Sequence, residues 1–357
     1  MLYPLSLIYG AVTGFRNFLY NSEVLKSHEF NFPVICVGNI TAGGTGKTPH
    51  CEYIIDLLKD KFNVSLLSRG YKRKSSGFLI ATPGLGPSDI GDEPMQIFSK
   101  FPDITVAVDS DRVNGVNSIL RERPQTKVVI LDDGFQHRNI KPGFTILLTD
   151  YSRLMIHDNM LPYGNLREYV SNMSRADIIL ITKTPPDLSP IQRRIIVKEI
   201  NKSPWQNLYF TSLVYKDPLP VFSGTETGAD ILKKGNKEDR GIILVTGIAR
   251  AELFKEYVSQ FAGELIHIPF PDHHDFSAGD IKAIAEAFTS LQKSHKYIIT
   301  TEKDAVRLRE FTNFAEPLRS SFFYIPTGIS FLNDDTNEFN NLITEYVRKN
   351  KRNNRVS

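Results

Sequence analysis

Residues 38–48 read GNITAGGTGKT and place four glycines and one lysine within eleven positions. They follow the apolar run FPVICV, which is typical of a buried strand, and precede PHCEYIIDLLKD, whose apolar spacing predicts a helix. Backbone N–H groups converge on an anion where the chain bends tightly with no side chain in the way, and glycine allows that bend. Such a loop places its lysine at the terminal phosphates and its hydroxyl residue at magnesium, ahead of the positive end of the following helix.

The first position of this loop departs from the usual phosphate-loop pattern. That pattern, G-x-x-x-x-G-K-[ST], begins with glycine, whereas this chain has Thr41 there. A glycine-rich turn that binds nothing is the alternative interpretation. If the loop binds a nucleotide, the nucleotide-binding residues are Thr41, Ala42, Gly43, Gly44, Thr45, Gly46, Lys47 and Thr48.

Phosphoryl transfer also needs an acidic residue at the end of another strand, which holds magnesium directly or through water. The segment KVVILDDGFQHR supplies Asp132 and Asp133 after an apolar run. An Asp-Gly pair after a strand is by itself typical of a turn. Beside a phosphate loop, the metal-binding interpretation is favoured.

The choice of nucleotide depends on a guanine-reading pattern, N/T-K-x-D, at the end of a later strand. The segment ILITKTP comes near it, but Pro185 occupies the aspartate position. In TTEKDAVRL the lysine and the aspartate are adjacent instead of separated. The sequence therefore favours ATP over GTP.

A transferase needs a base for the acceptor hydroxyl, and two segments offer candidates. Asp92 in GDEPMQIF is one, although an aspartate there also suits a helix cap. The cluster Asp272, His273, His274 and Asp275 in FPDHHDF suits an acid–base pair, a metal site or a polar loop. The sequence alone does not show whether these segments meet.

Four basic residues gather in SRGYKRKSSG, between positions 69 and 74. A solvated loop is the ordinary interpretation of such a run. At the end of a strand near the phosphate loop, it could instead receive an anionic acceptor, and Tyr71 in its middle suits an amphiphilic one.

Short β-rich runs alternate with helical segments along the chain, for example FNVSLLSRG, DITVAVDS and ADIILITK. Unbroken apolar runs of this kind indicate strands that are covered on both faces, so we expect an α/β fold with a mostly parallel, P-loop-type sheet. The pattern restarts near residue 220. We expect a membrane-interface helix at 1–28, a P-loop kinase core at 29–220 and a smaller α/β domain at 221–357, with the site in a cleft between the two α/β domains.

The N-terminal segment MLYPLSLIYGAVTGFRNFLY is the most apolar part of the chain. An apolar stripe recurs at helical spacing, at Leu5, Ile8, Val12, Phe15 and Leu19. The apolar run is only about half of the ~20 residues that a bilayer span requires. It predicts a helix that lies in a membrane interface, and the alternative is a helix packed on its own domain.

Composition limits the possible partners. The 357 residues carry a net charge of +3, which is too small to indicate nucleic-acid binding. The two cysteines, Cys36 and Cys51, form no C-x-x-C pair and suggest buried thiols in a reducing compartment.

Taken together, the motifs resemble the tetraacyldisaccharide 4'-kinase family, the ATP-dependent kinases of lipid A synthesis. Nearly the whole chain takes part, since an apolar N-terminal helix is followed in order by VGNITAGGTGKTP, LLSRGYKRKS, GDEPMQ, DSDR, ILDDGFQHR, LPYGNLRE, FPDHHDF and TTEKDAVRL. The resemblance also accounts for Thr41, because the phosphate loop of this family commonly opens with a small hydroxyl residue.

The resemblance implies roles for the matching residues. Asp92 would be the catalytic base working with His273, and Lys47 would act on the phosphates. The metal residues would be Thr48, Asp132, Asp133 and Glu168. The residues for the phosphate and sugar of the acceptor would be Arg69, Tyr71, Lys72, Arg73 and Arg112, with Gln136 and His137 as supporting residues.

The resemblance implies a monotopic enzyme on the cytoplasmic face of the bacterial inner membrane. It would use ATP and Mg²⁺ to phosphorylate the 4'-hydroxyl of a tetraacylated glucosamine disaccharide 1-phosphate, giving lipid IVA, with no obligate protein partner. Two alternatives remain open. One is a membrane-associated ATPase switch that phosphorylates no substrate, and the other is a soluble small-molecule kinase.

Overall fold

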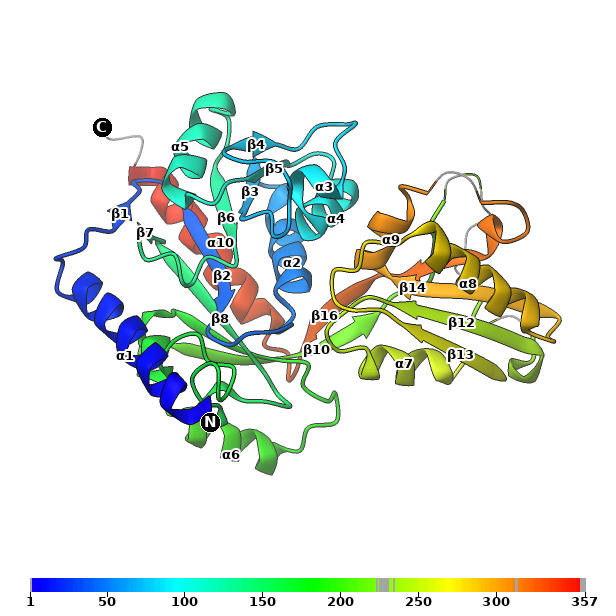
Figure 1. The fold of residues 1–357 in the computed structure, drawn as a ribbon. Coiled ribbons are helices and arrows are strands. Elements are labelled where there is room, and N and C mark those ends of the chain that lie inside the picture. Colours follow the sequence, from blue (N-terminus) through cyan, green and yellow to red (C-terminus); the bar gives the residue numbers. More distant parts are fainter. Residues whose placement is uncertain (1, 223, 225–230, 234, 312–313, 354–357) are drawn as a thin grey trace. The chain divides into compact units, whose positions relative to one another are not determined.

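The computed structural model describes residues 2–222, 224, 231–233, 235–311 and 314–353 (Figure 1). The chain forms two compact units. The first comprises Met1–Pro83, Ile97–Val214 and Gly328–Ser357, and the second combines Gly84–Gln96 with Tyr215–Thr327. Asp92 therefore belongs to the same unit as the FPDHHDF segment, although about 180 positions separate them in the sequence.

The first unit is built on a mostly parallel sheet. In spatial order its described strands are β16 (Thr327–Phe331), β10 (Asn207–Tyr215), β9 (Ile178–Thr182), β8 (Phe144–Asp150), β2 (Val34–Asn39), β6 (Val128–Asp132), β3 (Val64–Ser68), β5 (Thr105–Val108) and β4 (Leu79–Ile80). The pairs from β10 to β5 are parallel, and β4 pairs antiparallel with β5. All residues of β2, β3, β6 and β9 are buried, as unbroken apolar runs predict. The expected α/β fold is confirmed.

Helices cover this sheet and carry local start signals. They are α1 (Leu2–Asn21), α2 (Lys47–Lys59), α5 (Arg112–Glu122), α6 (Pro190–Ile200) and α10 (Thr336–Asn353), with short 3₁₀ turns η1 (Met155–His157) and η2 (Val170–Arg175). Helix α4 (Asp92–Lys100) is divided between the units, since Gln96 belongs to the second and Ile97 to the first. The side chain of Asp111 caps α5, and Ser189 with Gln192 forms a capping box at α6. A two-stranded ribbon pairs β1 (His28–Glu29) with β7 (Ile140–Lys141).

The second unit has its own sheet. In spatial order its described strands are β11 (Leu219–Pro220), β15 (Phe322–Ile325), β14 (His295–Thr301), β12 (Arg240–Thr246) and β13 (Glu264–Pro269). Only β11 runs antiparallel to its neighbour. The helices are α3 (Pro87–Ile90), α7 (Glu252–Ser259), α8 (Ala278–Ser290) and α9 (Glu302–Leu308), with 3₁₀ turns η3 (Lys237–Asp239) and η4 (Arg319–Ser321). Helix α9 starts where β14 ends, and Thr301 caps it.

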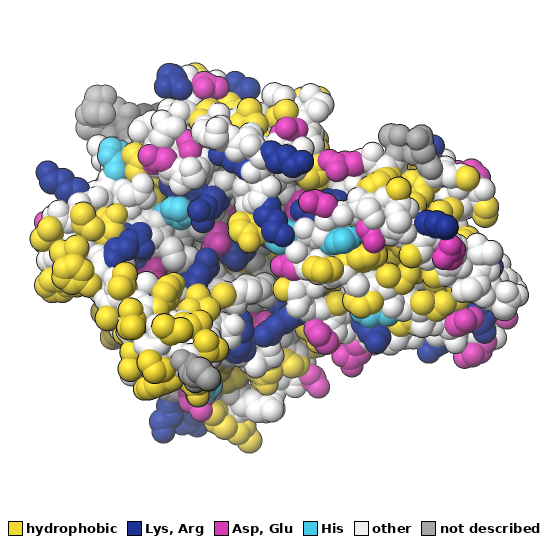
Figure 2. All heavy atoms as spheres, in the orientation of Figure 1, with side chains coloured by type: hydrophobic (Ala, Val, Ile, Leu, Met, Phe, Trp, Pro, Cys, Tyr) yellow, Lys and Arg dark blue, Asp and Glu magenta, His cyan; other side chains and the backbone are white. Residues whose placement is uncertain are grey.

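Helix α1 contacts the first unit through its polar and small residues. The Ser6 hydroxyl donates to the carbonyl of Met160 at 2.7 Å, and a Cβ at Gly10 would lie only 2.5 Å from the Tyr169 hydroxyl. The apolar stripe faces outward: Ile8 is 62% exposed and Phe15 is 64% exposed. Figure 2 shows hydrophobic side chains gathered over α1. The described residues of the chain therefore leave the stripe uncovered.

None of the described helices is both long enough and apolar enough to span a bilayer.

Candidate active site

The phosphate-loop segment connects β2 directly to α2. Gly43 and Gly46 have φ angles of +101° and +83°, which a residue with a Cβ adopts only with strain. Gly46 stands at the N-terminal cap of α2, immediately before Lys47. A Cβ built on Gly44 would meet no other atom within 4 Å. The bend is therefore open at Gly44 and is not filled by side chains of the described chain.

The loop is anchored from several elements of the first unit. The Asn39 amide donates to the Thr45 hydroxyl at 2.8 Å, and the Thr182 hydroxyl donates to the Thr45 carbonyl at 2.9 Å. The Ala42 N–H donates to the carbonyl of Asn165 at 2.7 Å. These bonds hold the loop in shape before any ligand is bound.

Four basic side chains surround this loop. Lys47 lies 3.7 Å from Asp133, Arg167 lies 3.1 Å from the same carboxylate, and Arg153 donates to the carbonyl of Ala42 at 2.8 Å. Lys183 donates to the carbonyl of Gly44. These basic side chains also pair with Asp133, Asp150 and Asp158, and a polyphosphate that took the place of these carboxylates would find four cations around the loop.

Of these four cations, only Lys47 lies in the phosphate-loop motif of the sequence. Lys183 lies in ILITKTP, the segment that resembles the guanine-reading pattern, and Arg167 lies in the LPYGNLRE motif. Arg153 has no motif of its own. Its position follows from the turn after β8, where the Ser152 amide and hydroxyl both donate to Asp150.

The two adjacent aspartates point to different partners. Asp132 is buried and accepts hydrogen bonds from the Ser68 hydroxyl at 3.1 Å and from the Cys51 thiol. Asp133 has a φ of +50°, and its side chain is 33% exposed beside Lys47 and Arg167. Burial alone would raise the pKa of Asp133, but Lys47 and Arg167 outweigh it and hold the pKa below its usual value. Asp133 is thus a charged group beside the phosphate loop.

Glu168 lies in a different environment. Its Oε2 accepts bonds from Arg175 at 2.6 Å and from Asn17 of α1 at 3.0 Å, while its Oε1 is buried without a hydrogen-bond partner among the described residues. Within the described part of the chain, no three histidine, cysteine or acidic side chains gather closely enough to hold a metal by themselves. Magnesium in nucleotide sites needs only one or two carboxylates beside the phosphates, so Asp133 with Thr48 fits that requirement. A metal role for Glu168 stays a prediction.

The predicted acceptor residues differ in accessibility. Arg69, Tyr71 and Lys72 are exposed on the loop after β3, while Arg73 donates to the carbonyl of Gly77 at 2.6 Å. Arg112 is fully buried, and its guanidinium donates to the backbone carbonyls of Asp109 and Asp132. A direct contact between Arg112 and the acceptor therefore stays a prediction, and the contacts observed for it support the end of β6.

Gln136 connects the phosphate-loop strand to α1, and His137 follows it. The Gln136 side-chain amide donates to the Asn39 backbone carbonyl at 2.6 Å, and the Gln136 backbone carbonyl accepts from Arg16 at 3.0 Å. Burial, together with the nearby cations Arg112 and Arg69, lowers the pKa of His137 to about 4. His137 is therefore a neutral ring at physiological pH.

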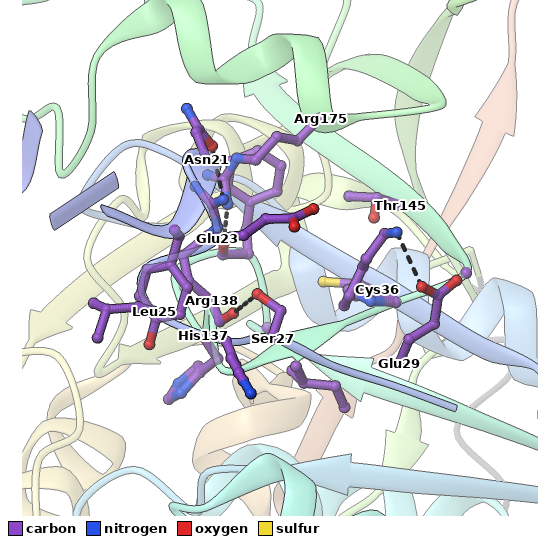
Figure 3. A pocket seen from close by; sticks show the side chains of 18 of the residues that line it. Asn21, Glu23, Leu25, Ser27, Glu29, Cys36, His137, Arg138, Thr145 and Arg175 are labelled. Carbon is purple, nitrogen blue, oxygen red and sulfur yellow. Dashed lines mark hydrogen bonds and ion pairs between the residues drawn. The ribbon is translucent and has the colours of Figure 1, made fainter. Parts of the chain in front are cut away.

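A cavity of about 780 Å³ opens beside His137 (Figure 3). Its walls come from the end of α1, from the segment after β6, from β7 and from the starts of β8 and β9. Charges of both signs line it, among them Arg138, Arg175, Glu23 and Glu29, and Figure 3 shows Glu23 close to Arg138 and Glu29 apart from them. The Lys141 ammonium lies 3.0 Å from the Glu29 carboxylate and forms an ion pair with it. Apolar side chains such as Leu25 and Phe135 line the cavity as well, so its surface is mixed in polarity.

In the second unit the structure brings Asp92 and His273 together. His273 Nδ1 lies 2.7 Å from Asp92 Oδ2, and the Arg307 Nε–H donates to Asp92 Oδ1 at 2.6 Å. Burial raises the pKa of Asp92, but the hydrogen bond to His273 and the ion pair with Arg307 outweigh it, so the pKa lies below its usual value. Asp92 is 3% exposed. Its carboxylate is therefore buried and charged, with His273 and Arg307 as its partners.

The other polar residues of the FPDHHDF cluster bind partners other than Asp92. His274 Nε2 lies 2.9 Å from Asp280, and Asp275 accepts from Arg307 at 2.8 Å. Asp272 accepts from Lys303 at 2.8 Å. Of the three interpretations considered for the cluster, the observed contacts support an acid–base pair made with Asp92.

Comparison with known proteins identifies the family. The family model for tetraacyldisaccharide-1-P 4'-kinase matches residues 1–348. This chain belongs to that family.

Members of the tetraacyldisaccharide 4'-kinase family align over almost the full length. The protein of that name from Bacteroides thetaiotaomicron is 45% identical over 361 aligned positions, which cover 100% of this chain and 95% of the relative. The one from Flavobacterium johnsoniae is 41% identical, covering 98% and 97%. The crystal structure of LpxK from Aquifex aeolicus in complex with ATP superposes with a TM-score of 0.74 at 29% identity, over 97% of this chain and 98% of that one.

Proposed function

We propose that this protein transfers the γ-phosphate of ATP to the 4'-hydroxyl of a tetraacylated glucosamine disaccharide 1-phosphate. The open, cation-lined phosphate loop carries this proposal. Membership of the tetraacyldisaccharide 4'-kinase family supports the acceptor, and the ATP complex of the Aquifex aeolicus relative supports the donor. The product would be lipid IVA, in lipid A synthesis.

The first unit supplies the groups that bind and neutralise the triphosphate. Amides of residues 43–48 and the positive end of α2 face the phosphates, and Lys47 exchanges its partner Asp133 for the terminal phosphate. Arg153 and Lys183 hold the loop carbonyls and add positive charge. Magnesium held by Thr48 and Asp133 would neutralise the charge that develops between the β- and γ-phosphates.

Asp92 is the base in this proposal. The 4'-oxygen forms a bond to the γ-phosphorus, the bond from that phosphorus to the β,γ-bridging oxygen breaks, and ADP leaves. The hydroxyl proton passes to Asp92, whose four lone-pair sites leave room for a third hydrogen bond beside His273 and Arg307. A carboxylate of lowered pKa is a weak base, which suits a loose transition state where the proton moves late.

The exposed stripe on α1 supports action at a membrane. An acylated disaccharide resides in a bilayer, and the stripe presents residues such as Ile8 and Val12 to an apolar phase. Arg16 next to the stripe suits anionic headgroups. Because ATP is cytosolic, the proposed location is the cytoplasmic face of the inner membrane. The proposal includes no obligate protein partner.

The test is an assay of phosphate transfer in detergent micelles that contain the lipid disaccharide and γ-labelled ATP. We expect label in the lipid, with one lipid phosphorylated for each ADP formed. ATP consumption without labelled lipid would support the ATPase switch instead and would contradict the proposal. A fixed amount of lipid IVA carried through extraction shows that the product is recovered.

A further inference from the structure

Helix α9 holds the Asp92–His273 pair from one face. Lys303 and Arg307 are four positions apart on this helix, so their side chains project from the same side. Arg307 binds Asp92 Oδ1, and Lys303 Nζ lies 3.0 Å from His273 Nε2. Lys303 also donates to Asp272 at 2.8 Å. Both cations belong to the TTEKDAVRL motif, and Lys303 has no role in the proposed mechanism.

The contact with Lys303 determines which nitrogen of His273 carries the proton. A lysine ammonium has three donors and no acceptor, so Nε2 must accept its hydrogen bond with a lone pair. The proton of the neutral ring then lies on Nδ1 and donates to Asp92 Oδ2, 2.7 Å away. One ammonium thereby sets the direction of the hydrogen bond to the proposed base.

The surroundings hold this arrangement firmly. His273 has a φ of +59°, a strained value for a residue with a Cβ, and its N–H donates to the carbonyl of Gly247 at 3.3 Å. The Gly247 N–H donates to Asp304 at 2.9 Å, and Asp304 also accepts from the Thr301 hydroxyl at 2.6 Å. The loop that carries His273 and the first turn of α9 are thus tied to one glycine.

The burial of Lys303 distinguishes it from an ordinary surface lysine. Its side chain is 15% exposed and has two polar partners, whereas Lys282 of α8 is 79% exposed with a weak pair at 3.9 Å. Immobilising a lysine costs side-chain entropy, and a solvated lysine would avoid that cost. Among the described residues, Asp92, Asp272 and Lys303 are charged or titratable groups that face His273.

We propose that Lys303 is a positioning residue that keeps His273 in the Nδ1–H tautomer, so that the ring donates to Asp92 and orients its carboxylate toward the acceptor hydroxyl. The role in turnover rests on the proposed function, in which Asp92 is the base. The tautomer itself does not depend on that function. Lys303 acts through His273 and makes no contact with the reacting atoms in this proposal.

The first experiment needs no variant of Lys303. Full-length protein labelled with ¹⁵N-histidine is examined at neutral pH by long-range ¹H–¹⁵N correlation, and the His273 signals are assigned from their loss in His273→Gln. We expect a protonated Nδ1 and an unprotonated Nε2. A wild-type spectrum with the proton on Nε2 overturns the proposal, whether or not the protein is a kinase.

The second experiment measures kinetics. Lys303→Met removes the ammonium, and we expect kcat to fall about tenfold or more, with KM for ATP and lipid within about threefold of wild type. Lys303→Arg restores a donor and should recover most of kcat, and Lys282→Met serves as the matched control. In Lys303→Met the Nε2–H tautomer should appear in the ¹⁵N spectrum.

The two proposals fail in different ways. Unchanged kcat together with an unchanged tautomer in Lys303→Met overturns the role of Lys303. A wild type that transfers no phosphate overturns the proposed function instead, and with it the role in turnover, while the ring spectrum still decides the tautomer. If Lys303→Met does not fold, the wild-type spectrum and Lys303→Arg decide the question.

Discussion

The Lys47 ammonium lies 3.7 Å from Oδ2 of Asp133, so the first residue of α2 is paired with the residue that follows β6. This pair joins the two motifs on which nucleotide chemistry depends. Against the effect of burial, Lys47 is also a main cause of the lowered pKa of Asp133. A triphosphate would take over the ammonium and leave Asp133 for a metal or its water ligands.

Lys47→Ala should weaken both ATP binding and turnover. A hydrogen bond to a charged group contributes about 1.5–3 kcal/mol, so we expect the Kd for ATP to rise roughly 10- to 100-fold and kcat to fall as well. Titration calorimetry and the transfer assay measure the two effects. Lys59→Ala, at the other end of α2, is the control. ATP affinity equal to wild type in Lys47→Ala would refute the assignment.

Asp92→Asn should lower turnover while ATP affinity stays within about twofold of wild type, because Asp92 has no assigned role in the phosphate loop. Steady-state kinetics and calorimetry on the same preparation test this. If the variant loses ATP affinity and turnover to the same extent, Asp92 has been misassigned.

Asp92 also makes a pH-dependent contribution to stability. Its folded pKa is depressed, so its contribution is present above the unfolded value of about 3.9 and is lost as pH falls through the folded value. Removing one partner of a buried pair costs on the order of 3 kcal/mol, so Asp92→Asn should lower the free energy of unfolding at pH 7. Urea unfolding at pH 7 and pH 3 measures this. If Asp92→Asn lowers the free energy of unfolding as much at pH 3 as at pH 7, the ion pair is not the source of the loss.

His137 should stay neutral between pH 5 and 8. Its folded pKa of about 4 lies below the unfolded value of about 6.5, so it destabilises the protein progressively as pH falls from 6.5 toward 4. The C2 proton of His137, assigned with His137→Asn, should show no titration step in this range. N-acetyl-histidine amide provides the reference titration. A midpoint near 6.5 would contradict the burial of this ring.

The outward-facing apolar stripe on α1 predicts that the protein binds membranes. A single charge introduced into the stripe should weaken this binding. Phe15→Glu replaces an exposed apolar side chain and should reduce binding to anionic vesicles about tenfold or more, with ATP affinity unchanged. Leu253→Glu on α7 makes the same kind of change at a residue 51% exposed and should have no effect. Vesicle sedimentation measures both. Equal binding by wild type and Phe15→Glu would exclude the stripe as the membrane contact.

Much of the first unit could be predicted from sequence, because its strands are unbroken apolar runs and its phosphate loop is local. The glycine bend, the strand before it and the helix after it occupy consecutive residues. The orientation of α1 also follows from its pattern, since the buried residues Ser6, Gly10 and Asn17 lie away from the apolar stripe. Local periodicity suffices for features of this kind.

Features that depend on long-range packing could not be predicted from local pattern. Arg153 and Lys183 reach the phosphate loop from the ends of β8 and β9, and Arg167 reaches it from the segment before η2. No spacing rule connects these three residues to the loop. Similarly, Asp92 meets His273 only because residues 84–96 fold with the second unit. The sequence supplied both residues as candidates, but the contact between them is a property of the tertiary structure.

The most direct test of the central claim locates the transferred phosphate. Wild-type protein is incubated with ATP and the tetraacylated disaccharide 1-phosphate, and the lipid is extracted for ¹H–³¹P correlation NMR. The proposal predicts a second phosphorus signal that correlates with the proton on C4' and is missing in the reaction with Asp92→Asn. A lipid that keeps only its 1-phosphate while ATP is hydrolysed would contradict it.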